Sequence, residues 1–272
     1  MKRLSTFNTT ALTLGFAFLY LPMILLVIYS FNASKLVTVW AGFSTKWYGE
    51  LLRDEAFLDA AWVTIKVAVM SSTLATVLGT MAAYVLVNSG RFLGRTLFSG
   101  MIYAPLVMPE VITGLSLLLL FIGIGLDRGV LTIVLAHTTF AMCYVSVVVS
   151  SRLVSFDRSL EEAALDLGCT RLEAFRLVTL PIIAPAVISG WLLAFTLSLD
   201  DLVIASFVSG PSSTTLPIKI WSAVRLGVSP EINALSTMMI GVVTIGVISA
   251  SLVSKRNSVR AQKDAQAAED AK

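Results

Sequence analysis

The sequence predicts an all-α, polytopic membrane protein, and three observations support this fold class. Of its 272 residues, 56% are hydrophobic and only 14% are charged, whereas soluble domains carry about a quarter charged residues. Six long apolar segments alternate with short polar connections, as in helices that cross a bilayer. The Lys and Arg residues are unevenly distributed between alternate connections. The lipid bilayer is therefore the expected solvent, and the scattered basic residues give no support to nucleic-acid binding.

Each of the six segments is long enough to cross a bilayer, which takes about 20 helical residues. They cover residues 11–31, 60–87, 101–126, 130–151, 182–208 and 232–253. The first follows Met1-Lys2-Arg3, as in a signal peptide, but it is longer than the usual apolar region of about 7–15 residues and no A-x-A cleavage site follows. We therefore expect it to be the first transmembrane helix of a single membrane domain over residues 1–272.

The basic residues define the expected orientation. With a cytoplasmic N-terminus, 13 of the 20 Lys and Arg residues lie inside and six outside, with Lys66 within the second segment. The inside set is Lys2, Arg3, Arg91, Arg95, Arg152, Arg158, Arg171, Arg176, Lys255, Arg256, Arg260, Lys263 and Lys272, and the outside set is Lys35, Lys46, Arg53, Arg128, Lys219 and Arg225. Both termini are thus expected in the cytoplasm, the second as a polar, solvated tail over residues 255–272.

The only extended inside loop, residues 152–181, carries clear helix signals. Ser159 followed by Glu162, and Thr170 followed by Glu173, have the spacing of capping boxes. In such a box the hydroxyl and the carboxylate satisfy each other's backbone N–H groups at the start of a helix. Two short helices are therefore expected, each beginning one residue after its Ser or Thr.

Gly168 is expected to end the first of these helices, because glycine readily adopts the left-handed conformation of a helix end. Pro181 marks a second interruption, where the chain enters the fifth segment. A small apolar face on the first helix is predicted from Leu160, Ala163, Ala164 and Leu167. Such a face needs a partner, either the protein's own membrane helices or another protein. A DNA-reading helix-turn-helix is discounted, since the loop is tethered to the bilayer at both ends and its first helix is acidic.

The loop resembles the EAA signature of permease subunits in ATP-binding-cassette importers. That signature has EAA, three residues, Gly, nine residues, Ile, one residue and Leu-Pro. The matching residues are Glu162, Ala163, Ala164, Gly168, Val178, Leu180 and Pro181. The spacing agrees throughout, and the one departure, Val178 in place of Ile, keeps an apolar β-branched side chain.

The resemblance implies a permease of the type I importer kind, with a cytoplasmic coupling helix between the fourth and fifth segments that sits in a groove of an ATPase. By this likeness the residues that contact the ATPase are Glu161, Glu162, Ala163, Ala164, Gly168, Leu180 and Pro181. The implied partners are a second, homologous permease, an ATPase dimer and a soluble extracytoplasmic binding protein. ATP and Mg²⁺ would belong to the ATPase, so no cofactor is expected on this chain.

Three carboxylates lie inside apolar segments, where charges are costly and usually face a cavity or a partner. Asp200 and Asp201 interrupt the fifth segment, and Glu110 follows Pro109 in the third. Asp200 would lie about 27 Å along its helix from the cytoplasmic end, in the outer half of the membrane. The aspartates suit either a cation pathway or ties between helices, and their side chains point about 100° apart, so only one faces a pathway squarely. For Glu110 a local polar pocket beside Pro109 is the stronger interpretation.

From about residue 20 to 248 the chain is similar to the permeases of polyamine importers, and most of all to the putrescine type. The supporting stretches are Val27-Ile28-Tyr29-Ser30-Phe31-Asn32, Pro109-Glu110-Val111-Ile112-Thr113-Gly114, Ser198-Leu199-Asp200-Asp201 and Ser229-Pro230-Glu231-Ile232-Asn233-Ala234-Leu235. A dicationic cargo would explain the carboxylates, so the resemblance favours Asp200, Asp201 and Glu110 as the substrate path. Putrescine is the expected cargo, with spermidine or another small solute as the alternative. The expected location is the bacterial inner membrane.

Other chemistry finds little support in the sequence. His137 lies in an apolar segment without ligands at metal-binding spacing, and Cys143 and Cys169 lie in different settings that do not suggest a disulfide. P-loop, GxSxG and HExxH motifs are absent, so ATP hydrolysis or proteolysis cannot be assigned to this chain. Two rivals remain, a proton-coupled transporter that uses the aspartates and a purely structural membrane subunit. The first leaves the capped loop unexplained, and the second leaves the aspartates idle.

Overall fold

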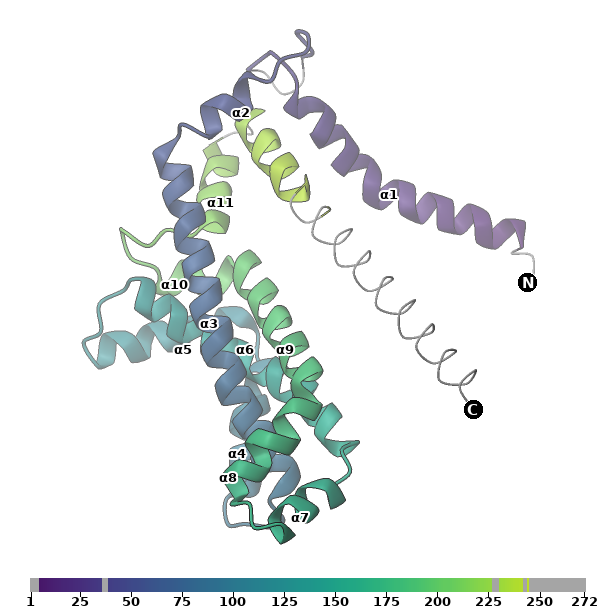
Figure 1. Cartoon of the computed structure of the whole chain (residues 1–272). Coiled ribbons are helices and arrows are strands. Elements are labelled where there is room, and N and C mark those ends of the chain that lie inside the picture. Colours follow the sequence, from purple (N-terminus) through teal and green to yellow (C-terminus); the bar gives the residue numbers. More distant parts are fainter. Residues whose placement is uncertain (1–4, 36–38, 227–229, 242–243, 245–272) are drawn as a thin grey trace. The chain divides into compact units, whose positions relative to one another are not determined.

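A computed structural model describes residues 5–35, 39–226, 230–241 and 244. The described chain is almost entirely helical, and its one β feature is an isolated bridge between Asn32 and Phe43 (Figure 1). The predicted all-α class is therefore confirmed. The predicted polar tail and the second half of the segment at 232–253 lie outside the described residues, although residues 230–241 are helical.

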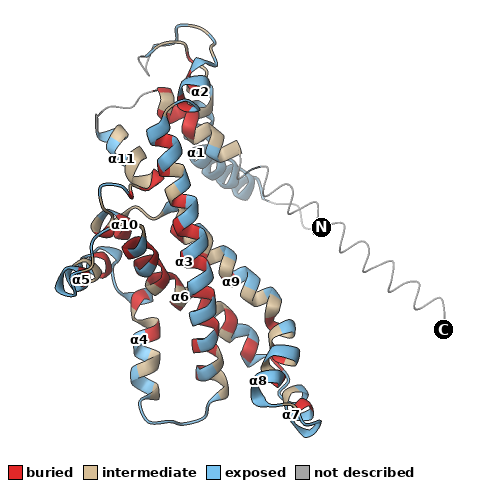
Figure 2. Ribbon diagram, turned by 60° about the vertical axis from the view of Figure 1, so that its left-hand side comes forward, coloured by how far each residue is buried: buried red, intermediate tan, exposed pale blue. Residues whose placement is uncertain are grey.

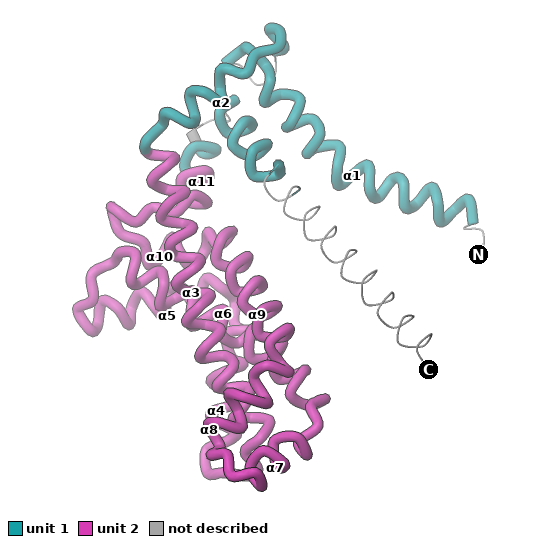
Figure 3. The backbone as a smooth tube through the Cα atoms, viewed as in Figure 1, with its two compact units in different colours: residues 1–55, 222–272 teal, residues 56–221 magenta. Residues whose placement is uncertain are grey.

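Besides the helical residues 230–241, the described helices are α1 (Thr6–Ser30), α2 (Lys46–Leu51), α3 (Glu55–Asn88), α4 (Arg95–Val107), α5 (Glu110–Gly123), α6 (Val130–Val154), α7 (Ser159–Asp166), α8 (Arg171–Ala174), the π-helix η1 (Phe175–Thr179), α9 (Leu180–Asp200), α10 (Val203–Val208) and α11 (Leu216–Leu226). The chain forms two compact units, residues 1–55 with 222–272 and residues 56–221 (Figure 3). The features expected to carry function lie in the second unit.

Helix α6 forms the core of the second unit. Val145, at its centre, is fully buried between Gly79 of α3 and Gly190 of α9. A Cβ atom added to Gly79 would lie only 2.8 Å from the Val145 Cβ and 2.7 Å from the Met142 carbonyl oxygen. The absence of a side chain at Gly79 thus allows α3 to approach the α6 backbone. This close approach fixes three membrane helices around one side chain.

Burial along the helices follows this arrangement. Buried residues recur along α6, whereas α1 of the first unit is exposed on nearly every side (Figure 2). An apolar helix that is exposed in the isolated chain would meet lipid or another membrane subunit.

The third predicted segment, 101–126, is not one continuous helix. It is broken into α4 and α5, which are bent by 119° at Met108 and Pro109. Proline cannot donate a backbone hydrogen bond, and its ring pushes the preceding residue out of the helical region. Met108 accordingly has extended backbone angles, φ −76° and ψ 136°. Glu110 therefore begins a new helix instead of lying within a continuous one.

The second predicted loop helix does not end at Pro181. The helical chain runs from Arg171 through the π-helix η1 into α9, so the predicted interruption was wrong. In η1 the Leu180 N–H donates to the Phe175 carbonyl, five residues back. This wider turn immediately precedes the residue that lacks an N–H, and π turns are a common way to keep a helix continuous past such an irregularity.

The fifth predicted segment, 182–208, contains a break of its own. Helix α9 ends at Asp200, Asp201 is extended with φ −64° and ψ 119°, and the short α10 follows. Helix α10 then packs against α5 and α6. The two aspartates therefore lie at a helix end and not inside a continuous span.

Four described helices are long and apolar enough to cross a membrane, and the bent pair α4 and α5 makes a possible fifth. The sixth predicted span extends beyond the described residues. A count of six remains a prediction.

In the first unit, the end of α1 is held by the chain that follows it. The buried Asn32 donates from its side-chain amide to the Val39 carbonyl and accepts from the Ala41 N–H, at 2.8 and 2.9 Å. The Trp47 indole of α2 donates to the Asn32 carbonyl at 2.7 Å. These bonds satisfy a helix end that would otherwise leave polar groups unpaired.

The packing of Val145 against Gly79 predicts opposite effects on stability for two glycine substitutions. Gly79→Ala should destabilise the protein by about 1–3 kcal/mol, because the new methyl group overlaps the α6 backbone. Gly100→Ala in α4 meets no atom within 4 Å and should be neutral or stabilising by up to about 1 kcal/mol. Thermal unfolding of the purified variants measures both. Equal melting temperatures would contradict the assigned packing.

Candidate functional site

The inside loop forms a helical hairpin, α7 to η1, that we call the coupling hairpin. Its corner is Gly168, with φ +91°, a left-handed conformation that favours glycine. The Gly168 N–H donates to the Leu165 carbonyl and the Cys169 N–H to the Ala164 carbonyl, at 2.9 and 3.1 Å. This is the Schellman arrangement of a helix end, so the predicted stop at Gly168 is confirmed.

One of the two predicted capping boxes is present. The Thr170 hydroxyl accepts from the Glu173 N–H, and the Glu173 carboxylate accepts from the Thr170 N–H at 2.7 Å. The box predicted at Ser159 is wrong, because α7 starts one residue earlier. The Asp157 carboxylate instead accepts from the Ser159 N–H at 3.0 Å. Hydrogen bonds from the Ser159 hydroxyl and N–H lower the pKa of the Asp157 carboxyl.

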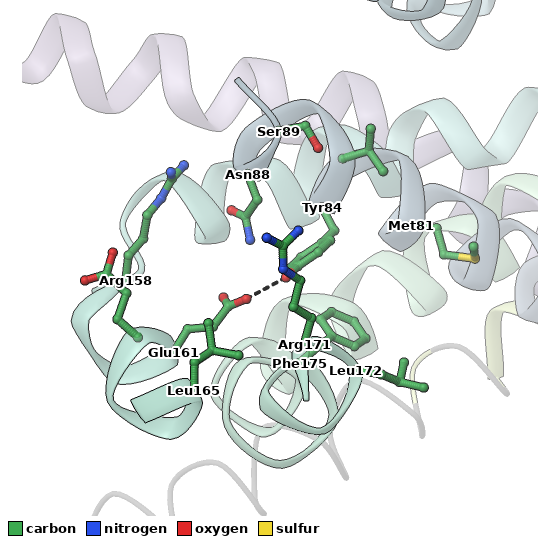
Figure 4. Close-up of a pocket in the computed structure, with 12 residues that line it drawn as sticks. Met81, Tyr84, Asn88, Ser89, Arg158, Glu161, Leu165, Arg171, Leu172 and Phe175 are labelled. Atoms are coloured by element: carbon green, nitrogen blue, oxygen red, sulfur yellow. Dashed lines mark hydrogen bonds between the residues drawn. The ribbon is translucent and has the colours of Figure 1, made fainter. Parts of the chain in front are cut away.

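Glu161 ties the coupling hairpin to the membrane helices. Its Oε1 accepts a hydrogen bond of 2.6 Å from the Tyr84 hydroxyl on α3, and its Oε2 accepts one of 3.1 Å from the Thr179 hydroxyl on η1 (Figure 4 shows the first). Thr179 is fully buried. A charged acceptor strengthens both bonds. One side chain of the loop thus holds the end of one membrane helix and the start of another.

Two more contacts support this anchor. The Phe175 ring meets the Tyr84 ring edge-on, with centroids 4.8 Å apart. The Arg158 guanidinium donates to the Val87 carbonyl at 2.7 Å. The hairpin and the end of α3 enclose a groove of about 680 Å³, and Figure 4 shows the side chains that line it, Glu161 and Tyr84 among them.

The opposite side of the hairpin is exposed. Of the predicted apolar face, only Ala164 is buried, while Leu160 and Ala163 are exposed and Leu167 is 88% exposed. Within this chain only Ala164 packs, so the other three residues of the predicted apolar face remain open to another protein. Leu172, beyond the corner, is 74% exposed. We call Leu160, Ala163, Leu167 and Leu172 the exposed face of the hairpin.

The residues expected to contact an ATPase therefore divide by position. Glu161 and Ala164 face the protein's own helices, whereas Glu162, Ala163 and Gly168 are exposed. The remaining two, Leu180 and Pro181, start α9, where Leu180 is half-buried and Pro181 is exposed.

The membrane carboxylates also divide by position. The Asp201 side chain is 6% exposed, and its Oδ1 lies 3.4 Å from the His137 Nε2 and accepts from the Ala205 N–H at 2.8 Å. On the other ring nitrogen, His137 shares a hydrogen bond of 2.7 Å with the Ser198 hydroxyl. Asp201 thus caps the first turn of α10 and joins it to α6.

Asp200 and Glu110 are both exposed in this chain, Asp200 at the end of α9 and Glu110 in the first turn of α5. No hydrogen bond or ion pair among the described residues links Glu110 to either aspartate. The structure therefore sets these two apart from Asp201 and leaves both available to an external charge.

Several residues of these sites escaped prediction from sequence. Tyr84 stands in an apolar stretch without a motif, and Thr179 is the unspecified position between Val178 and Leu180 of the EAA signature, so only their distant partner, Glu161, gives them a role. His137, for which the sequence shows no metal ligands at suitable spacing, shares a hydrogen bond with Ser198 of α9. One signal in the sequence could have paired His137 with Asp201. The two polar side chains lie in neighbouring apolar segments, where each of these side chains needs a partner.

Comparison with known proteins assigns the family. Residues 75–261 match the family described as binding-protein-dependent transport system inner membrane component. The chain belongs to this family. This permease is 60% identical over 263 residues to the putrescine transport system permease protein PotI of Escherichia coli K12, and the aligned region covers 94% of each chain. It is 42% identical to the spermidine/putrescine permease PotC of the same organism, over 90% of this chain and 92% of PotC.

Solved structures of importers share the fold of this inner-membrane permease. A chain of a bacterial ABC transporter for the import of the acidic polysaccharide alginate matches with a TM-score of 0.71 at 19% identity, over 90% of this chain and 94% of that chain. A chain of the MetNI methionine transporter matches with a TM-score of 0.59 at 16% identity, over 77% and 95%. The predicted fold of an importer permease is thus confirmed.

The anchor predicts a difference between two neighbouring glutamates. Glu161→Ala removes the acceptor of two hydrogen bonds and should lower stability by about 1.5–3 kcal/mol. Glu162→Ala alters an exposed side chain and should change stability by less than about 0.5 kcal/mol. The melting temperatures of the two purified variants make the comparison. A loss with Glu162→Ala as large as that with Glu161→Ala would refute the anchor.

Proposed function

We propose that this permease carries putrescine into the cytoplasm as the membrane-spanning subunit of an ATP-driven importer that works by alternating access. The 60% identity to a putrescine permease over nearly the whole of both chains supports the cargo. Its partners are a second, homologous permease, two copies of an ATPase that hold ATP and Mg²⁺, and a soluble binding protein outside the membrane. Both termini then lie in the cytoplasm, which agrees with the distribution of Lys and Arg.

One observation carries the proposal, namely that the coupling hairpin has a bonded side and an exposed side. The bonded side holds α3 and η1 through Glu161, whereas the exposed face presents Leu167 and Leu172. Large apolar side chains on a short hairpin are costly in water and favour a protein groove. ATP-driven closure of the ATPase pair would move the hairpin, and the Glu161 anchor would carry that movement into the membrane helices.

The divided carboxylates support a cation path with distinct roles. Asp200 and Glu110 are exposed and would attract the ammonium groups of the cargo, because an acid at membrane depth usually faces a pathway or a partner. Asp201 is engaged by His137 and Ala205, so it would hold the break between α9 and α10 that leaves Asp200 at a helix end. Asp201 is then a positioning residue of the path.

Docking through the exposed face is tested with Leu167→Asp. A carboxylate there would be buried unpaired against the ATPase, so the permease should remain in the membrane but lose at least about tenfold of its ATPase co-purification and its uptake. The matched control is Leu93→Asp, which places the same charge at another fully exposed leucine, outside the hairpin. Normal ATPase recovery with Leu167→Asp would contradict the proposed contact.

The roles of the two aspartates are tested with matched alanine variants. Asp201→Ala leaves the His137 Nε2 without its carboxylate and α10 without a cap, and should lower stability by about 1–3 kcal/mol. Asp200→Ala should leave the melting temperature unchanged and lower putrescine uptake severalfold. Radiolabelled uptake at equal membrane levels gives the second measurement. Unchanged uptake with Asp200→Ala would remove this residue from the path.

The cargo and the energy source are tested on the reconstituted complex. Excess unlabelled putrescine should abolish labelled uptake, spermidine should compete more weakly, and an amino acid should not compete. Uptake that needs ATP but no proton gradient supports the importer. Uptake driven by a proton gradient without ATP would favour a secondary transporter in its place.

A further inference from the structure

A second cavity lies beside the coupling hairpin and has no role in the proposed transport cycle. It measures about 450 Å³ and lies between the end of α3, the start of α4 and the end of α6. Its polar lining consists of Arg95, Ser99, Tyr103, Ser150 and Arg158. The lining therefore holds two guanidinium groups and three hydroxyl groups, and it contains no carboxylate.

The two arginines are fixed but not neutralised. Arg95 donates to the Leu86 and Gly90 carbonyls, at 2.8 and 3.0 Å, and Arg158 donates to the Val87 carbonyl. These bonds hold both groups against the negative end of α3, yet carbonyl acceptors carry no formal charge. Neither arginine forms an ion pair within the described part of the chain. Two positive charges are thus held at one opening.

A buried hydroxyl also faces this cavity without a partner. The Ser150 oxygen on α6 is shielded from solvent and makes no hydrogen bond to any described residue. A buried polar atom left unpaired is costly, so rotation of the Ser150 side chain toward an acceptor in the cavity would be favourable. Anionic oxygen atoms suit this hydroxyl and the guanidinium donors together.

The surroundings indicate where such an anion comes from. The apolar walls are Leu86, Val87 and Val154, and Val154 is 75% exposed. The cavity lies where two membrane helices end, at the surface predicted to face the cytoplasm. Basic pockets between membrane helices at that surface bind anionic lipid headgroups. We infer that this cavity binds the phosphate of an anionic phospholipid, whose acyl chains lie along the neighbouring apolar surface.

The test uses the assembled complex and a matched pair of variants on α4. Ser99→Glu places a carboxylate inside the cavity and changes neither arginine residue, whereas Thr96→Glu adds the same charge on the exposed side of the same helix. Native mass spectrometry counts phosphatidylglycerol and phosphatidylcholine molecules that stay bound. One basic group at a membrane surface strengthens anionic lipid binding about fivefold, so Ser99→Glu should lower phosphatidylglycerol retention by about fivefold or more relative to Thr96→Glu.

Three results would overturn the inference. They are equal retention in both variants, equal retention of phosphatidylcholine and phosphatidylglycerol by the unaltered complex, and displacement of the lipid by excess inorganic phosphate. The last would assign the cavity to a free phosphate. If Ser99→Glu prevents assembly, Arg95→Gln decides by the same criterion, since it removes one charge from the cavity and leaves the contacts of the hairpin anchor unchanged. The outcome does not depend on the cargo, so transport and lipid binding can fail separately.

Discussion

The position of the coupling hairpin depends on the two hydrogen bonds that the Glu161 carboxylate accepts. Helix α7 has eight residues, and a helix of that length is unstable by itself in water. The two carboxylate oxygens of Glu161 accept hydrogen bonds from Tyr84 on one membrane helix and from Thr179 at the start of another, so the hairpin is held from both sides. The exposed face can then contact a partner while the hairpin keeps its position, and a displacement of the hairpin is passed to both membrane helices.

A movement of the hairpin can change the transport pathway only if the membrane helices move together. The packing of the core gives a reason for such a joint movement. Val145 is enclosed by Gly79 and Gly190, so α3, α6 and α9 share one contact too close to slide. Asp201 extends this body to α10 through His137 and the Ala205 N–H. The hairpin, three membrane helices and the end that carries Asp200 are thus one continuous chain of contacts.

Much of the fold and of the hairpin could be predicted from the sequence, since the length of apolar segments, capping residues and glycine act locally. Gly168 and the Thr170 capping box were predicted correctly for that reason. The bend at Pro109 and the continuous helix past Pro181 were missed, because a proline can break a helix or be absorbed by a π turn, and packing decides which. The pairs Glu161 with Tyr84 and Asp201 with His137 join distant segments, so no local pattern reveals them.

The bonds of Glu161 to Tyr84 and Thr179 predict that the hairpin and α3 move as one body. Spin labels at Val77, which is exposed on α3, and at Leu172 on the hairpin test this in the reconstituted complex, with Cys143 and Cys169 replaced. Pulsed electron resonance gives their separation with and without trapped ATP. If the hairpin and α3 form one body, the two states give the same distance distribution. A shift greater than the width of the distribution would show that the hairpin moves independently of α3.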